Sequence, residues 1–176
     1  MKRILAVIAI CLTMGVASLS AQTLSYPTEA KAAYTRVKKF LLAAADKMPE
    51  ENYAFKASPD VRPFGQLIAH VADTQWMICS AVKGEDKKGD AASKTTKADL
   101  VAALKASFDY CDSAYDAAND ATIGDKVRLF QRDFSKLSVL FLNTIHDNEM
   151  YGTMAVYLRA KGVVPPSSEP RGNNKK

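Results

Sequence analysis

The chain has 176 residues, of which 24 are Lys or Arg and 19 are Asp or Glu, so its formal net charge is +5. This length is enough for one domain with a substantial core. The basic residues are spread along the chain and form no stripe with aromatic residues, so the composition gives little support to nucleic-acid binding. We therefore expect no nucleic-acid partner.

The first 21 residues have the layout of a secretory signal peptide. Lys2 and Arg3 precede an apolar run over residues 4–19, and a patch of small residues ends at Ala21. The run is shorter than the ~20 residues that a membrane span needs, so we prefer cleavage to a lasting membrane anchor. Because the segment contains two basic residues and no acidic ones, the mature chain has a net charge of +3. We predict an exported protein, periplasmic or secreted, with no membrane partner after cleavage.

Apolar residues at helical spacing predict four helices in the mature chain and no strand of any strength. We expect these helices over residues 28–48, 63–82, 97–119 and 133–161. Pro63 suits a first helical turn, Thr96 is a candidate N-cap, and Gly162 is a stop signal. The predicted fold class is all-α, with one four-helix bundle domain over residues 22–166. The tail over residues 167–176 is rich in Ser, Pro, Gly, Asn and Lys and is predicted to be disordered.

The polar loop over residues 83–96 is long for a turn between neighbouring antiparallel helices. It could let the chain cross the bundle, so that the second and third helices run parallel. Cys79 and Cys111 would then lie at similar depths, ~24 and ~21 Å into their helices, and an oxidising compartment would permit a disulfide. If the two helices are antiparallel, the cysteines should instead be half-buried thiols that behave as small apolar residues.

The last predicted helix is apolar around most of its circumference, so it should be buried on more than one side. One strip on its back face needs cover of its own, and it consists of Leu140, Tyr151, Met154 and Leu158. The exit segment over residues 163–166 could fold over this strip, or a second copy of the chain could cover it. The second alternative predicts a homodimer through the last helix.

The mature chain has two histidines, His70 and His146, each in the middle of a different predicted helix at the edge of an apolar stripe. Bundle proteins build metal sites from inward-facing ligands on facing helices, and imidazole binds zinc, nickel, copper or iron. A histidine at a helix edge is nevertheless more often a partly buried polar residue, and no HxxxH or HExxH pair is present. The residues alone leave a metal site and two unrelated histidines as alternatives.

The segments around both histidines resemble the DinB superfamily. Residues 62–75 read RPFGQLIAHVADTQ, which is similar to the second-helix motif of that family. The last helix resembles the family's in HDNEMYG, which starts at His146, and in the continuation VYLR and VPP over residues 156–166. The resemblance implies a four-helix bundle, commonly dimeric, with three histidine ligands, one on the second helix and two on the last. Its relatives include metal-dependent thiol transferases and maleylpyruvate isomerases.

Met150 stands where the family usually has its third histidine. Positions 146 and 150 share a helix face, but a thioether is a weak ligand for zinc or nickel and a better one for Cu(I). Three alternatives follow: a divalent metal held weakly by two histidines, a water and a borrowed carboxylate; copper held by His70, His146 and Met150; or a metal-free fold. Asp73 and Glu149 are the candidate carboxylates, although Asp73 points away from His70 on a helical wheel.

The resemblance therefore implies a divalent-metal-binding protein, with zinc or nickel as the preferred ion, copper as another candidate, and no metal as the remaining alternative. An open coordination position would permit metal-dependent hydrolysis or thiol transfer on an unknown small molecule. We assign no catalytic residue. The competing hypothesis is a non-catalytic binding or interaction protein with a degenerate metal site.

Overall fold

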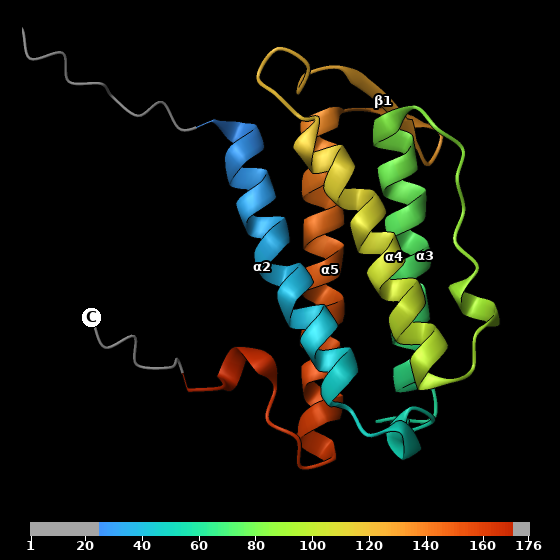
Figure 1. The fold of residues 1–176 in the computed structure, drawn as a ribbon. Coiled ribbons are helices and arrows are strands. Elements are labelled where there is room, and N and C mark those ends of the chain that lie inside the picture. The colour runs from blue at the N-terminus through green and yellow to red at the C-terminus, as the bar shows by residue number, and fades with distance from the viewer. Residues whose placement is uncertain (1–24, 171–176) are drawn as a thin grey trace, which may run out of the picture.

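The computed structural model describes residues 25–170, which form a bundle of four long helices (Figure 1). They are α2 (Tyr26–Lys47), α3 (Phe64–Lys83), α4 (Lys97–Asp116) and α5 (Lys136–Ala160). Three short 3-10 turns complete the helical elements, η2 (Glu50–Asn52), η3 (Ala91–Ser93) and η4 (Pro166–Ser168). The all-α prediction is confirmed. The predicted signal peptide lies outside the described residues, and none of the helices within them is long and apolar enough to cross a membrane.

The connection between α3 and α4 crosses the length of the bundle, so these two helices run parallel (Figure 1). Asp73 on α3 holds this crossover, because its carboxylate accepts hydrogen bonds from the backbone N–H groups of Ala91 (2.8 Å) and Ala92 (3.0 Å). The parallel arrangement places Cys79 and Cys111 opposite each other with their Cα atoms 5.3 Å apart, and they form a disulfide. Of the two alternatives for these cysteines, the structure has the bridge.

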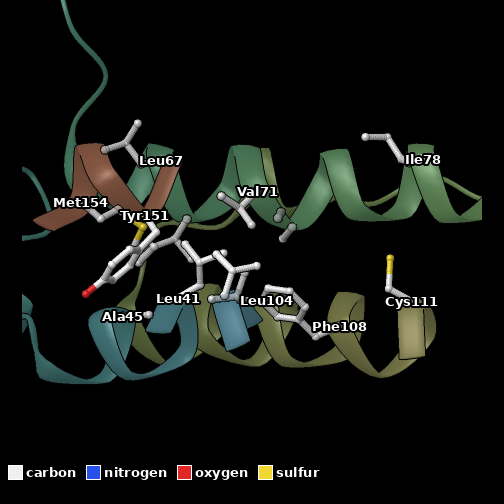
Figure 2. Close-up of a cluster of buried hydrophobic side chains, with 14 of the residues drawn as sticks. Leu41, Ala45, Leu67, Val71, Ile78, Leu104, Phe108, Cys111, Tyr151 and Met154 are labelled. Atoms are coloured by element: carbon white, nitrogen blue, oxygen red, sulfur yellow. The ribbon is translucent and has the colours of Figure 1, made fainter. Parts of the chain in front are cut away.

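The core lies where the apolar stripes of the four helices meet (Figure 2). Leu41 of α2, Leu104 of α4 and Met154 of α5 are each fully buried there. Phe108 of α4 and Ile68 of α3 are also fully buried. Burying one such side chain contributes about 1.5–3 kcal/mol, which is why the helical spacing of these residues determines the fold.

The back face of α5 is covered within one chain. Its four apolar residues, Leu140, Tyr151, Met154 and Leu158, are at most 7% exposed. The Phe40 ring of α2 stacks on Tyr151 at a centroid distance of 5.1 Å. The chain itself, rather than a second copy, therefore covers these four residues, and the exposed apolar side chains of α5 are Phe141, Ile145 and Val156. The homodimer stays a prediction.

The exit segment also covers α5. Tyr151 donates its hydroxyl hydrogen to Ser167 Oγ (2.7 Å) and accepts a hydrogen bond from the Ser167 backbone N–H (2.8 Å). Arg159 donates to Ser168 Oγ at 2.7 Å. These two serines, which the sequence places in a disordered tail, thus belong to the folded domain.

A β-hairpin precedes α5 and was not predicted. Strands β1 (Lys126–Leu129) and β2 (Arg132–Ser135) pair antiparallel, and Val127 and Leu129 are buried beneath it. Ser135 ends the hairpin and caps α5, so the helix begins three residues later than expected. The turn residues Phe130 and Gln131 have φ angles of 49° and 61°, in the left-handed region. Asn and Gly are the usual residues at such positions, so the sequence carries no turn signal here.

Replacing Phe130 with Asn and Gln131 with Gly should stabilise the protein, because both new residues adopt left-handed conformations at lower cost. We expect the free energy of unfolding, measured by urea denaturation, to rise by about 1 kcal/mol. Phe130→Ala removes the aromatic ring but keeps the strain, so it should give no gain. A double variant no more stable than wild type would contradict the strain argument.

Removing the disulfide with Cys79→Ala and Cys111→Ala should lower the free energy of unfolding by about 3–4 kcal/mol, because the bridge joins positions 32 apart in sequence. Thermal and urea unfolding with and without a phosphine reductant measure this loss. Reduced wild type should approach the variant, and the variant itself should not respond to reductant. Equal stability of the oxidised wild type and the variant would contradict the prediction.

Candidate metal centre

Two imidazole rings converge between α3 and α5. The Nε2 atoms of His70 and His146 are 3.1 Å apart, and the ring centroids are 5.0 Å apart at an interplanar angle of 72°. His70 lies early on α3 and His146 near the middle of α5, and these helices run in opposite directions side by side (Figure 1). The bundle thus brings together the two histidines that the sequence singles out.

The spacing of the two nitrogens suits either a proton or a metal ion between them. Without an ion, one Nε2 atom must carry a hydrogen and the other must accept it. Two imidazole nitrogens that bind one ion at ~2.0–2.1 Å each, with an angle between a right angle and a tetrahedral one, lie roughly 2.9–3.4 Å apart. The observed 3.1 Å falls in this interval.

The electrostatic environment keeps His70 neutral. Burial lowers the pKa of His70, and the nearby charge of Arg62 and the second imidazole lower it further, while Asp73 and Glu149 act in the opposite direction. Neutral imidazole is the form that binds metal. Both rings are half-buried, and the His146 side chain is 18% exposed, so the pair sits at the edge of the core within reach of a small ligand.

The position at which the family resemblance implies a third histidine holds Met150, a weak donor. Met150 lies one turn after His146 on α5 and packs, partly buried, against the hydrophobic core. Asp73 is engaged with the crossover backbone, and Glu149 is exposed. Among residues 25–170, no group of three or more His, Cys, Asp or Glu side chains could hold a metal ion. The site therefore has two imidazoles and no third strong ligand in place.

A buried polar cluster next to the histidines was missed from the sequence. Gln75, Asn143 and Asp147 are each 0% exposed. Gln75 Nε2 donates to Asp147 Oδ2 (2.5 Å), and Asn143 Nδ2 donates to Gln75 Oε1 (3.1 Å) and to Tyr115 Oη (3.3 Å). The available signal was two polar residues four apart, Asn143 and Asp147, on a helix that is apolar around most of its circumference.

The buried position of Asp147 makes its carboxyl hard to ionise. Burial raises the pKa of its carboxyl to about 6, and the contacts with His146 and Gln75 offset only part of this effect. Its second oxygen, Oδ1, has no hydrogen-bond partner among the described residues and lies 3.8 Å from His146 Nδ1, which is also buried and unpartnered there. Buried polar atoms are rarely left in this state, so the pair points to a functional arrangement.

A surface groove of about 620 Å³ lies between α2 and α5 but includes neither histidine. It is lined by Val37, Phe40, Ile145 and Tyr151, among others. The candidate centre is thus separate from this hollow and is formed by α3 and α5.

Comparisons with known proteins agree with this architecture. The family model described as the DinB superfamily matches residues 33–154, which is more than half of the chain. A DinB-like protein from Bacillus cereus is 17% identical with a TM-score of 0.68, and the match covers 77% of this chain and 92% of that one. A DinB-like protein from Bacillus subtilis is 17% identical with a TM-score of 0.65, over 81% and 96% of the two chains.

A mycothiol-dependent maleylpyruvate isomerase has a similar structure, with 12% identity, a TM-score of 0.62, and coverage of 75% of this chain and 63% of that one. At these identities the likeness shows a shared fold. No curated protein matches the chain.

Asp147→Asn should stabilise the metal-free protein at neutral pH. Below about pH 4 the Asp147 carboxyl is protonated in both the folded and the unfolded state. Between about pH 4 and 6 the unfolded state loses this proton while the folded state retains it, so the free energy of unfolding falls as pH rises. Above pH 6 the penalty is complete, about 3 kcal/mol for this shift. Urea unfolding in EDTA should therefore show a larger gain for the variant at pH 7.5 than at pH 4. Equal effects at both pH values would rule out this origin.

Proposed function

Because the chain belongs to the DinB superfamily, we propose that it is a divalent-metal-binding protein whose nitrogen ligands are His70 and His146. The observation that carries the proposal is the convergence of their Nε2 atoms to 3.1 Å, a separation that fits two nitrogens bound to one ion as well as a hydrogen bond between the rings. The lowered pKa of His70 supports it, since the ring is neutral and ready to bind at neutral pH.

The donor set suggests weak binding and open coordination positions. Two imidazoles suit zinc or nickel, whereas Met150, on the same face of α5 as His146, would favour copper. We take zinc or nickel as the ion, because the two nitrogens are the donors that the structure brings together. When bound, such an ion supplies Lewis acidity and lowers the pKa of a bound water or thiol.

The activity that this site would support is hydrolysis or thiol transfer on a small molecule. His70 and His146 would hold the ion, and their partial exposure gives a small ligand access. Cys79 and Cys111 are joined to each other, so residues 25–170 offer no free thiol, and a reacting thiol would come from another molecule. The mycothiol-dependent isomerase of similar fold makes a low-molecular-weight thiol the first substrate class to test.

We also propose that the protein works outside the cytoplasm, in a periplasm or as a secreted protein. The buried disulfide supports this, because such bridges persist in oxidising compartments. The signal-like segment at residues 1–21 supports the same conclusion from the sequence.

The competing proposal is a non-catalytic protein with a degenerate site. Met150 favours it, because its thioether leaves the family's third ligand position with a weak donor. This alternative predicts that the protein purifies without metal and that chelation does not change its melting temperature.

Untagged protein equilibrated with excess zinc or nickel should bind about one ion per chain, and His146→Ala should abolish this binding. Met150→His should raise affinity for zinc or nickel roughly tenfold, because it adds a third imidazole on the ligand face. Elemental analysis and competition with a chromogenic chelator measure both effects.

Met77→His provides the matched control, since it adds a histidine to an exposed position of α3. It should leave affinity unchanged. Metal-free wild type, together with an unchanged melting temperature after chelation, would favour the non-catalytic alternative. A Met150→His variant with wild-type affinity would contradict the assigned ligand face.

A further inference from the structure

We infer that Asp147 is a positioning residue that selects the tautomer of His146 with its hydrogen on Nδ1, leaving Nε2 free to bind metal. The part of this inference that concerns metal affinity rests on the proposed function. The part that concerns the tautomer holds for the metal-free protein and can be tested on its own.

The first observation is a pair of unpartnered atoms. Asp147 Oδ1 and His146 Nδ1 are both buried, neither has a hydrogen-bond partner among residues 25–170, and they are 3.8 Å apart. This distance exceeds a hydrogen bond by about 1 Å, a gap that contacts in unliganded sites often close on binding. A carboxylate oxygen can only accept, so the pair is satisfied only if Nδ1 carries the hydrogen.

The second observation is that the carboxylate cannot turn away. Gln75 on α3 donates to its other oxygen, Oδ2, at 2.5 Å. Asn143 donates to Gln75 Oε1 at 3.1 Å, which fixes the end of the Gln75 amide that faces Asp147. The donors thus run in one direction, from Asn143 through Gln75 to Asp147, and leave Oδ1 as the free acceptor toward His146.

This tautomer decides where the proton between the two rings lies. With its hydrogen on Nδ1, His146 presents a lone pair at Nε2, so the 3.1 Å contact requires His70 Nε2 to be the donor. His70 is therefore the ring that must move its hydrogen from Nε2 when an ion is bound. His146 is already in the binding form, as metal-ligating histidines are when a carboxylate holds the second ring nitrogen.

Asp147→Asn should reverse the tautomer of His146 rather than only weaken the preference for it. The Gln75 N–H group requires an acceptor, so the new amide must place its oxygen at the position of Oδ2. The amide N–H₂ group then faces His146 Nδ1 and donates to it. This selects the opposite tautomer, in which Nε2 carries the hydrogen and cannot bind metal.

The tautomer can be read directly by long-range ¹⁵N–¹H correlation NMR of histidine-labelled, metal-free protein at pH 7.5. We expect His146 to carry its hydrogen on Nδ1 in wild type and on Nε2 in Asp147→Asn. Asp73→Asn is the matched control, because it changes the carboxylate that acts on His70 and should leave His146 unchanged. A wild-type His146 with its hydrogen on Nε2, or the same tautomer in wild type and Asp147→Asn, would overturn the inference.

Zinc affinity, measured by chelator competition, gives a second readout. Asp147→Asn should weaken binding 10–100-fold, and Asp147→Ala should weaken it less, because alanine removes the acceptor without adding a donor. Equal affinity of wild type and Asp147→Asn would overturn the positioning role. If wild type binds no zinc, the proposed function fails, and the tautomer measurement still decides the role of Asp147.

Discussion

The hydrogen bond from Gln75 to Asp147 is the contact on which the site depends. It crosses the interface between α3 and α5 at a point where both side chains are fully buried, so losing it would leave a buried carboxylate unpaired. A slip of α5 by one turn, ~5.4 Å, would break this bond and also separate His70 from His146. The buried polar contact and the imidazole pair therefore require the same register of the two helices.

The crossover and the disulfide extend this constraint to a third helix. Gln75 Oε1 lies 2.6 Å from Cys111 Sγ on α4, and Cys111 is bridged to Cys79, one turn after Gln75 on α3. Parallel packing of α3 and α4 thus places the bridge directly beside the polar cluster. The disulfide, the polar cluster and the candidate centre are therefore neighbours in one core.

The helices were predictable because their apolar residues repeat at helical spacing. The length of the loop before α4 indicated a possible crossover but left the antiparallel arrangement open. The hairpin was not predictable, because its turn residues, Phe130 and Gln131, lack the usual signal and the paired strands have four residues each. The convergence of His70 and His146 could not be obtained from spacing, since the two residues lie on separate helices. The family resemblance supplied that expectation.

Asp147 shows why a residue proposed to position a ligand is harder to predict than the ligand itself. A single acidic residue on a helix usually faces solvent, and only the burial of both neighbouring polar residues, Asn143 and Gln75, reveals a different role. Met150 is the opposite case. Its identity was visible in the sequence as a departure from the family pattern, but its effect on a bound ion would depend on a coordination that the sequence does not determine.

The central claim is that both imidazoles bind one ion. X-ray absorption spectroscopy of protein loaded with one equivalent of zinc tests it most directly. The account predicts a first shell of nitrogen and oxygen at ~2.0–2.1 Å with the outer-shell scattering of two imidazoles per zinc. A shell that contains only oxygen, or a single imidazole per zinc, would contradict it.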